Sequence, residues 1–190
     1  QLDNPRATEY VAVLRRQAQR LKKLTEDLVE ASKASSGTMA VNRVPMELGE
    51  LLSQCNAEYA ERLAAANLEL VTDCPAGLQV LADGRLLWRV FDNLLGNACK
   101  YSQPGTRVYI TVEAAQEQVL VQVKNISREV LNVTPEALME RFVRGDSSRS
   151  AEGSGLGLSI AKSLMELNEG KLELAIDGDL FKALLTLGKP

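Results

Sequence analysis

The sequence predicts an α+β domain preceded by one long helix. Three observations favour this fold class: an uninterrupted helical stretch near the start, an alternation of helix-like and strand-like patterns after it, and a hydrophobic content of 45%. In 190 residues that content fills one core and an accessory element, and it falls short of two full domains. We therefore expect a helical segment over 1–37 and a folded domain over 38–190.

The first element is a helix from Arg6 to about Ser35, because this stretch holds neither Gly nor Pro. At 1.5 Å per residue it spans about 45 Å, more than a domain of this size needs. Its seam residues follow the four-three spacing of a heptad repeat: Tyr10, Leu14, Gln17, Leu21, Leu24, Leu28 and Ala31. The stripe favours pairing with a partner helix in a dimer or bundle, and a surface helix lying on the chain's own core stays the alternative.

Periodicity and turn residues predict the remaining elements. We expect helices over Met46–Asn67, from an Asp83 N-cap to about Tyr101, from Thr134–Pro135 to Phe142, and over Leu156–Asn168. We expect strands near Met39–Val44, over Leu68–Asp73 and Leu78–Ala82, and in two hairpins, the first turning at Gln116–Glu117 and ending near Asn125, the second formed by Gly170–Ile176 and Leu180–Leu187.

Composition excludes several classes of function. A net charge of −3 gives no global field that attracts nucleic acid or an acidic membrane, so an anion site must be local. The absence of histidine removes imidazole metal sites and Ser/His or Cys/His nucleophile pairs from this chain. Three widely spaced cysteines fit a reducing compartment, and no stretch approaches the roughly 20 apolar residues of a membrane span. We expect a cytosolic domain that is a piece of a longer protein.

Two asparagines on the helix that follows Asp83 are candidates for a binding site. Asn93, Asn97 and Lys100 share one stripe of that helix. An amide oxygen is a neutral ligand for Mg²⁺, and a nearby ammonium group suits phosphate oxygens, so this face could hold a magnesium polyphosphate. The alternative is that both amides cap or bridge locally.

A loop rich in Arg, Ser and Gly, Arg141–Ser159, precedes the last helix. Gly153, Gly155 and Gly157 let backbone N–H groups approach an anion, and the helix N-terminus adds a partial positive charge. The spacing matches neither a P-loop nor a Rossmann fingerprint, so a mobile linker stays the alternative for these glycines.

Taken together, these features resemble the sensor histidine kinases of two-component systems, within the wider ATPase class that includes type II topoisomerases and a heat-shock chaperone. "DNLLGNACKYS" is similar to the N box of that family, "LMERFVRGD" to its F box and "GSGLGLSIAKSLMEL" to its G2 box, in the family's order and spacing. The long first helix resembles the second helix of the dimerisation and phosphotransfer hairpin. The resemblance covers roughly Glu9 to Leu187 and implies a two-layer α/β sandwich of the Bergerat type, a mixed sheet with helices on one face.

The resemblance also implies roles for individual residues. Asn97 would ligand Mg²⁺, Asn93 would support the metal and phosphate cluster, Lys100 would pair with phosphate, and Tyr101 would pack near ATP. Together with Asn93, two arginines, Arg141 and Arg144, would form the catalytic set by reaching the γ-phosphate or the partner helix. The remaining ATP-binding positions form the lid hinge and the anion cradle: Gly153, Ser154, Gly155, Leu156, Gly157 and Leu158.

The chain departs from the family pattern in two places. Relatives carry an Asp-x-Gly-x-Gly box that reads the adenine amino group, whereas this chain has Asn125 at the Asp position and no glycines after it. A neutral acceptor is weaker than a carboxylate by ~1 kcal/mol, so we expect a modest loss of ATP affinity. The second departure is the phosphoacceptor histidine, which the resemblance places upstream of residue 1.

Three functions follow as hypotheses. The first is a kinase that transfers the γ-phosphoryl group of Mg-ATP to a histidine for relay to a response regulator, as a homodimer whose full-length form lies in the bacterial plasma membrane. The second is an ATP-hydrolysing clamp of the same fold, which the sequence disfavours because the position of the catalytic Glu is Asn93 and Asp92 points about 100° away. The third is an interaction module that binds no nucleotide.

Overall fold

The structure is a computed structural model that describes residues 5–35, 39–139 and 155–190. Its helices are α1 (Pro5–Ser35), α2 (Leu48–Ala65), α3 (Gly84–Tyr101), α4 (Pro135–Met139) and α5 (Gly157–Leu167). Its strands are β1 (Val44–Glu47), β2 (Glu69–Asp73), β3 (Gln79–Ala82), β4 (Arg107–Ala114), β5 (Gln118–Ile126), β6 (Lys171–Asp177) and β7 (Leu180–Gly188). The end of the helix expected to run to Phe142 lies outside the described residues.

Five strands form a mixed sheet in the order β2-β4-β5-β7-β6, and β1 and β3 form a separate antiparallel pair. β2 runs parallel to β4, whereas the other neighbours in the sheet are antiparallel. A parallel pair needs a crossover connection, and here the connection contains β3 and α3. Both hairpins expected from the sequence are present, and the predicted fold class is confirmed.

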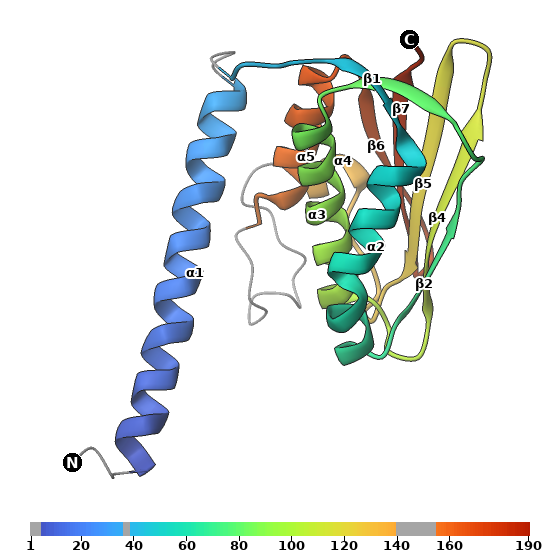
Figure 1. Cartoon of the computed structure of the whole chain (residues 1–190). Coiled ribbons are helices and arrows are strands. Elements are labelled where there is room, and N and C mark those ends of the chain that lie inside the picture. The colour runs from blue at the N-terminus through green and yellow to red at the C-terminus, as the bar shows by residue number, and fades with distance from the viewer. Residues whose placement is uncertain (1–4, 36–38, 140–154) are drawn as a thin grey trace.

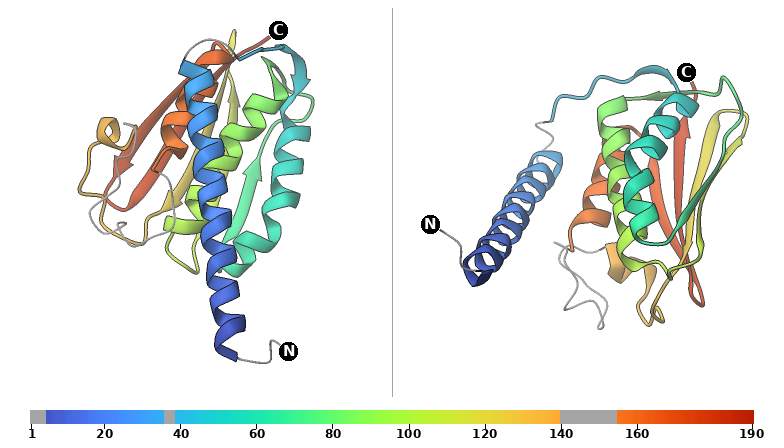
Figure 2. Two further views of the ribbon diagram at one scale, coloured as in Figure 1. Left: turned by 90° about the vertical axis from the view of Figure 1, so that its left-hand side faces the viewer. Right: turned by 60° about the horizontal axis from the view of Figure 1, so that its bottom comes forward.

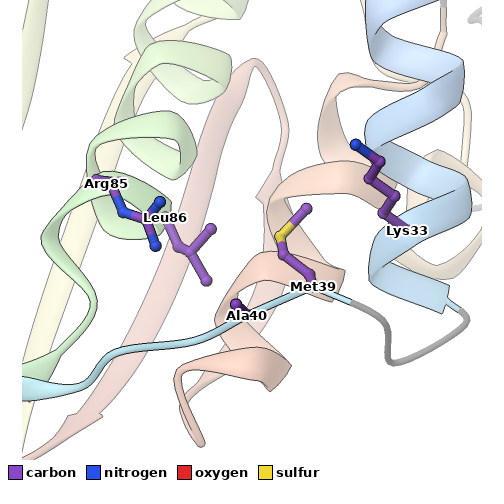
Figure 3. Close-up of a pocket in the computed structure, with 5 residues that line it drawn as sticks. All are labelled: Lys33, Met39, Ala40, Arg85 and Leu86. Carbon is purple, nitrogen blue, oxygen red and sulfur yellow. The ribbon is translucent and has the colours of Figure 1, made fainter.

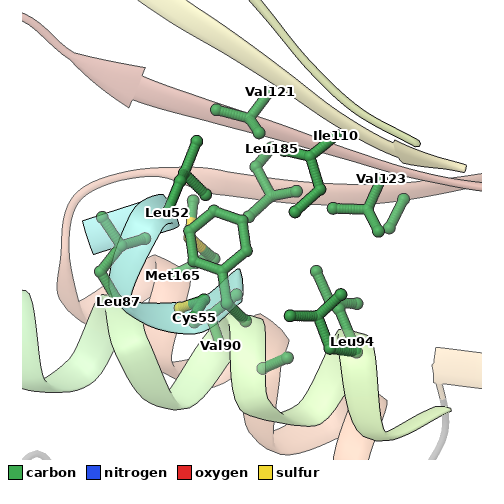
Figure 4. Close-up of a cluster of buried hydrophobic side chains, with 14 of the residues drawn as sticks. Leu52, Cys55, Leu87, Val90, Leu94, Ile110, Val121, Val123, Met165 and Leu185 are labelled. Atoms are coloured by element: carbon green, nitrogen blue, oxygen red, sulfur yellow. The ribbon is translucent and has the colours of Figure 1, made fainter. Parts of the chain in front are cut away.

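Helices α2, α3 and α5 cover one face of the sheet, so the domain has two layers (Figure 1). Burial along β5 alternates, with Val121 and Val123 buried toward the helices. In the core, Leu87 and Val90 of α3 face these two valines of β5 and Leu185 of β7 (Figure 4). Each such side chain contributes roughly 1.5–3 kcal/mol on burial, so this interface fixes the position of α3 against the sheet.

The start of α3 is held by its N-cap residue. The Asp83 carboxylate accepts hydrogen bonds from the backbone N–H groups of Arg85 at 3.0 Å and Leu86 at 3.4 Å. It also accepts one from the Asn42 N–H at 2.9 Å, which ties the segment before β1 to the same helix end. The cap predicted from the sequence is therefore present, and it stabilises α3 by satisfying N–H groups that the helix leaves unpaired.

The first strand lies later than the sequence pattern indicates. We expected a strand near Met39–Val44, and the structure has β1 at Val44–Glu47. Its partner decides this: Val44 pairs with Ala82, the last residue of β3, after which Asp83 begins the helix cap. Residues before Val44 therefore have no strand beside them to pair with.

α1 lies beside the helix layer and extends past it at its N-terminal end (Figures 1 and 2). Tyr10, Leu14 and Leu21 of the heptad stripe are 66–67% exposed. Near the C-terminal end, Asp27 and Ala31 are buried against the domain. The helix thus uses one face for contact within the chain and leaves most of its apolar stripe uncovered. Among the described residues, no helix is long and apolar enough to cross a membrane.

Candidate functional site

The two candidate asparagines lie one turn apart on α3, on its side toward α5. Asn93 is buried, at 9% exposed, and Asn97 is half-buried. The Asn93 Nδ2 donates a hydrogen bond to the Arg89 carbonyl at 2.9 Å. Half of this amide is therefore used within the helix, as the local alternative expects, while its Oδ1 faces the first residue of α5.

Gly157, which begins α5, approaches both asparagines closely. A Cβ on Gly157 would stand 3.0 Å from Asn93 Oδ1 and 3.8 Å from Asn97 Oδ1. Glycine permits this approach without displacing either amide. Two positions earlier, Gly155 has a φ of +70°, in the left-handed region that favours glycine. The backbone therefore requires both glycines at the point where α5 meets α3.

The N-terminus of α5 lies against this amide pair without a side-chain cap. Leu156 occupies the cap position and makes no side-chain cap hydrogen bond. The hydroxyl of Ser159 donates to the Leu156 carbonyl at 2.9 Å, so it does not serve the N–H groups either. A helix start that no side chain of the described residues caps, and whose dipole is positive, suits an anion such as phosphate.

The donors at this contact fit a magnesium phosphate better than a bare metal ion. Among the described residues, no group of three or more His, Cys, Asp or Glu side chains could hold a metal. Mg²⁺ in phosphate sites takes few protein ligands and completes its shell with phosphate oxygens and water. The amide oxygens of Asn93 and Asn97 match that donor set, and Lys100 lies one turn further along α3, where it is exposed.

Asn125 lies near the end of β5, beyond the stripe of α3 that carries Asn93, Asn97 and Lys100. It is 7% exposed and shares the helix-facing side of the strand with Val123. The backbone joins this region to the end of α3, because the Arg128 N–H donates to the Tyr101 carbonyl at 2.8 Å. Tyr101 and Asn125 are thus held at the same end of α3, one turn beyond Asn97.

Several predicted site residues lie outside the described residues: Arg141, Arg144, Gly153 and Ser154. Within the described residues, Leu156 is buried and Leu158 is half-buried in the core, so these two side chains position the start of α5. The structure therefore brings together Asn93, Asn97 and Gly157, while the assignment of a ligand to them stays a prediction.

Sequence reasoning missed a buried ionic cluster between α1 and α3. Arg89 contacts Asp27 at 3.2 Å and Glu30 at 3.0 Å on α1, and Asp92 at 2.7 Å on its own helix. The Tyr59 hydroxyl of α2 donates to Asp92 Oδ1 at 2.6 Å. Burial opposes the charge on Arg89, but the three carboxylates outweigh it and raise the pKa of this guanidinium.

The same cluster fixes the orientation of the Asp92 carboxylate. Both of its carboxylate oxygens are engaged, Oδ1 by Tyr59 and Oδ2 by Arg89, so the group is held away from Gly157. Burial, reinforced by the hydrogen bond to Asp92, raises the pKa of Tyr59 and keeps its proton in place as a donor. No sequence signal could have revealed the cluster, because its members come from three helices that are distant in the chain.

A cavity of about 510 Å³ lies elsewhere, between the end of α1 and the start of α3 (Figure 3). Its lining includes Lys33, Met39 and Leu86. Leu86 lies eleven positions before Asn97 on α3, about 16.5 Å along the helix axis, so this cavity is distinct from the amide pair. The three cysteines are free thiols, and burial raises the pKa of the Cys55 thiol to about 12, which keeps it protonated.

The chain is similar to curated bacterial sensor kinases. It is 31% identical over 166 residues to the signal transduction histidine-protein kinase BaeS of Escherichia coli K12, covering 86% of this chain and 36% of the relative. It is 31% identical over 169 residues to the sensor protein VanS of Enterococcus faecium, covering 86% of this chain and 43% of the relative. The chain therefore spans less than half the length of these relatives.

Solved structures share the fold. The histidine kinase AdeS of Acinetobacter baumannii matches with a TM-score of 0.76 at 17% identity, over 98% of this chain and 85% of that one. Full-length ShkA in complex with AMPPNP matches with a TM-score of 0.81 at 22% identity, over 98% of this chain and 40% of that one. Histidine kinase ThkA, in complex with the response regulator protein TrrA, matches with a TM-score of 0.75 at 22% identity, over 100% of this chain and 53% of that one.

The region that holds the amide pair and the start of α5 also carries a family match. Residues 82–185, more than half of the chain, match the family described as "Histidine kinase-, DNA gyrase B-, and HSP90-like ATPase". This span begins just before the Asp83 cap and ends in β7, so it includes both asparagines, Gly157 and Asn125. The chain belongs to the histidine kinase-, DNA gyrase B- and HSP90-like ATPase family.

Proposed function

We propose that this chain is the catalytic portion of a sensor histidine kinase. The chain binds Mg-ATP, and the γ-phosphoryl group of the ATP is transferred to a histidine for relay to a response regulator. The acceptor comes from outside these residues, because they contain no histidine. The similarity to BaeS and VanS supports a place in a sensor protein, and the fold shared with an AMPPNP-bound kinase supports the nucleotide.

The observation that carries the proposal is the contact of Gly157 with Asn93 and Asn97. It joins an uncapped helix start, which favours an anion, to two neutral oxygens, which favour Mg²⁺. Carboxylates in the same place would repel a triphosphate, whereas amides do not. In this assignment Asn97 holds the metal ion and Asn93 supports the phosphates.

The chain's own residues then act by position and charge. Lys100 offsets phosphate charge, and the first N–H groups of α5 donate to phosphate oxygens. Arg141 and Arg144 are assigned by resemblance to the γ-phosphate or the partner helix. The bound metal ion supplies charge neutralisation across the phosphates. A neutral imidazole would attack the γ-phosphorus in line while the bond to the bridging oxygen breaks and ADP leaves, and no general base is needed for that step.

The second candidate, an ATP-hydrolysing clamp, needs a carboxylate that activates water. Asn93 cannot take a proton, and both oxygens of Asp92 are engaged by Tyr59 and Arg89. These contacts favour transfer to a protein acceptor over hydrolysis. A measured turnover with ATP and Mg²⁺ in the absence of any acceptor would instead favour the clamp.

The proposal is tested by thermal unfolding with a non-hydrolysable ATP analogue, with and without Mg²⁺. Binding only to the folded state raises the melting temperature, and we expect the rise to depend on Mg²⁺. Asn97→Ala should abolish the Mg²⁺-dependent part. Asn42→Ala, at an exposed asparagine, is the matched control and should behave as the parent chain. A chain that shows no Mg²⁺-dependent shift at millimolar analogue would support the interaction module instead.

The remaining parts of the proposal concern partners and location. The exposed stripe of α1 pairs with a second copy to form a homodimer, and the full-length protein lies in the bacterial plasma membrane with this domain in the cytoplasm. Residues 1–37 form the second helix of the dimerisation hairpin, and residues 38–190 form the ATP-binding domain. The exposure of Tyr10, Leu14 and Leu21 supports the pairing.

A further inference from the structure

Three buried polar residues lie close together at the end of α3, beside the end of β5. Ser102, directly after α3, pairs with Ser127, directly after β5, in an isolated antiparallel bridge. Asn125 lies two residues before Ser127, on the same face of the chain. Residues diagonal across an antiparallel pair lie about 7–8 Å apart, so Ser102 and Asn125 are neighbours. All three residues are at least nine-tenths buried, at 1, 9 and 7% exposed for Ser102, Ser127 and Asn125.

The hydrogen bonds of this group are incomplete. The Ser127 hydroxyl donates to the Glu129 carbonyl at 2.7 Å. The Ser102 Oγ, by contrast, is buried and has no hydrogen-bond partner among the described residues. The Asn125 carboxamide likewise makes no side-chain hydrogen bond within the described part of the chain. Leaving a fully buried group such as the Ser102 hydroxyl unsatisfied costs about 1–3 kcal/mol, so this hydroxyl and the unengaged Asn125 amide beside it point to a ligand that completes them.

The position of the group matches the base end of the proposed nucleotide site. Ser102 lies five positions after Asn97, about 7.5 Å along the helix axis. A triphosphate at Asn97 and Gly157 therefore places its nucleoside along the end of α3, toward Asn125. This step rests on the proposed function.

We propose that Asn125 makes the site accept both 6-amino and 6-oxo purine nucleotides. The edge of adenine offers a donor at N6 and an acceptor at N1, whereas the edge of hypoxanthine offers an acceptor at O6 and a donor at N1. A carboxamide has one acceptor and one donor group side by side, so it matches adenine in one orientation and hypoxanthine after a half-turn. Because no side chain of the described residues fixes this amide, either orientation costs no internal hydrogen bond.

Among the described residues, one fixed charge is placed at this group by a hydrogen bond: the Arg128 Nη2 donates to the Ser102 backbone carbonyl at 3.5 Å, so this guanidinium is directed at the backbone. The Ser102 hydroxyl can donate or accept, as the amide can. A carboxylate at position 125 would only accept, so it would favour the amino group of adenine and repel the O6 of a 6-oxo purine. Asn125 is thus a specificity-determining residue for the base.

The test is competition for a bound fluorescent ATP analogue by ATP, ITP and UTP at fixed Mg²⁺. In the parent chain we expect the dissociation constants of ATP and ITP to lie within about tenfold of each other, with UTP weaker than both. In Asn125→Asp the ratio of the ITP dissociation constant to the ATP dissociation constant should rise at least tenfold. Asn132→Asp, the same change at an exposed position after β5, is the matched control and should leave the ratio unchanged.

Three results would overturn the inference while leaving the proposed function intact. The first is a parent chain that binds ATP but discriminates against ITP more than a hundredfold. The second is an Asn125→Asp variant whose ratio of the two dissociation constants equals that of the parent. Equal competition by UTP would also overturn it, since the base would then not be read. If the fluorescent analogue does not bind at all, the proposed function itself fails. Should Asn125→Asp not fold, Asn125→Ser replaces it and should weaken ATP and ITP by similar factors.

Discussion

Gly157 and Asn93 stand so close that a Cβ on the glycine would lie 3.0 Å from the Asn93 side-chain oxygen. Asn93 cannot yield freely, because its Nδ2 donates to the Arg89 carbonyl at 2.9 Å. The contact thus locks the start of α5 to the middle of α3 through one amide. It makes the geometry of the proposed phosphate site sensitive to a single methyl group.

Gly157→Ala should therefore weaken nucleotide binding more than it weakens the fold. The added methyl displaces the Asn93 oxygen, while alanine improves helix propensity by up to about 1 kcal/mol, which offsets part of the strain. We expect an unfolding free energy within about 1 kcal/mol of the parent chain and an affinity for Mg-ATP lowered at least tenfold, measured by calorimetric titration. Gly49→Ala is the matched control, because its Cβ would meet nothing closer than 3.8 Å. Unaltered affinity in Gly157→Ala would contradict the site.

The ionic cluster at Arg89 should be a major contributor to stability. Arg89→Ala removes the cation that contacts Asp27, Glu30 and Asp92, and the side chains of Asp27 and Asp92 are only 3% and 14% exposed. Removing one partner from a buried cluster costs about 3 kcal/mol, measured as unfolding free energy in urea. Arg107→Ala breaks a pair with Glu69 of similar length, 2.9 Å, but both of those side chains are more than half exposed, so no measurable change is expected. Equal losses in the two variants would show that burial of the cluster does not matter.

The N-cap of α3 predicts a dependence of stability on pH. Burial opposes ionisation of Asp83, but hydrogen bonds from Arg85 and from the backbone of Asn42, Arg85 and Leu86 outweigh it, and its pKa falls below the ordinary 3.8. The ionised cap therefore stabilises the fold fully above pH 3.8, and this contribution is lost as the pH falls from there through the lower pKa of the folded chain.

Asp83→Asn should remove that dependence. At neutral pH we expect the variant to lose up to about 1 kcal/mol of unfolding free energy, because asparagine lacks the charge that faces the helix N-terminus and Arg85, and the difference from the parent should shrink as the pH falls below the ordinary pKa. Urea unfolding at a series of pH values measures it. Asp177→Asn changes an exposed carboxylate and should give a constant difference near zero. A gap between Asp83→Asn and the parent that stays the same down to the lowest pH would refute the assignment.

The exposed stripe of α1 should govern self-association. Leu14→Glu with Leu21→Glu places charges at two stripe positions that are 67% and 66% exposed, so the fold of the domain should be unaffected. We expect the parent chain to dimerise with increasing concentration in light scattering and the double variant to remain monomeric. Ala12→Glu, on α1 outside the stripe, is the control and should still dimerise. A parent chain that is monomeric at high concentration would count against pairing through α1.

The sequence by itself determined the local structure and the family. The heptad spacing predicted α1, the Asp83 cap predicted the start of α3, and alternation predicted both hairpins of the sheet. These features depend on neighbours within a few residues, so periodicity and turn chemistry are enough to identify them. The first strand was misplaced because its position depends on its partner, Ala82, which no local pattern reveals.

Only the tertiary structure decided which side chains meet. It brought Gly157 against Asn93, placed Arg89 among carboxylates from α1 and α3, and buried Ser102 where it pairs with Ser127. These encounters join segments that are distant in the chain, and they are fixed by how the helices pack on the sheet and on one another. The candidate binding groups could be named from the sequence, whereas their contacts follow from packing, because van der Waals and hydrogen-bond distances depend on the whole fold.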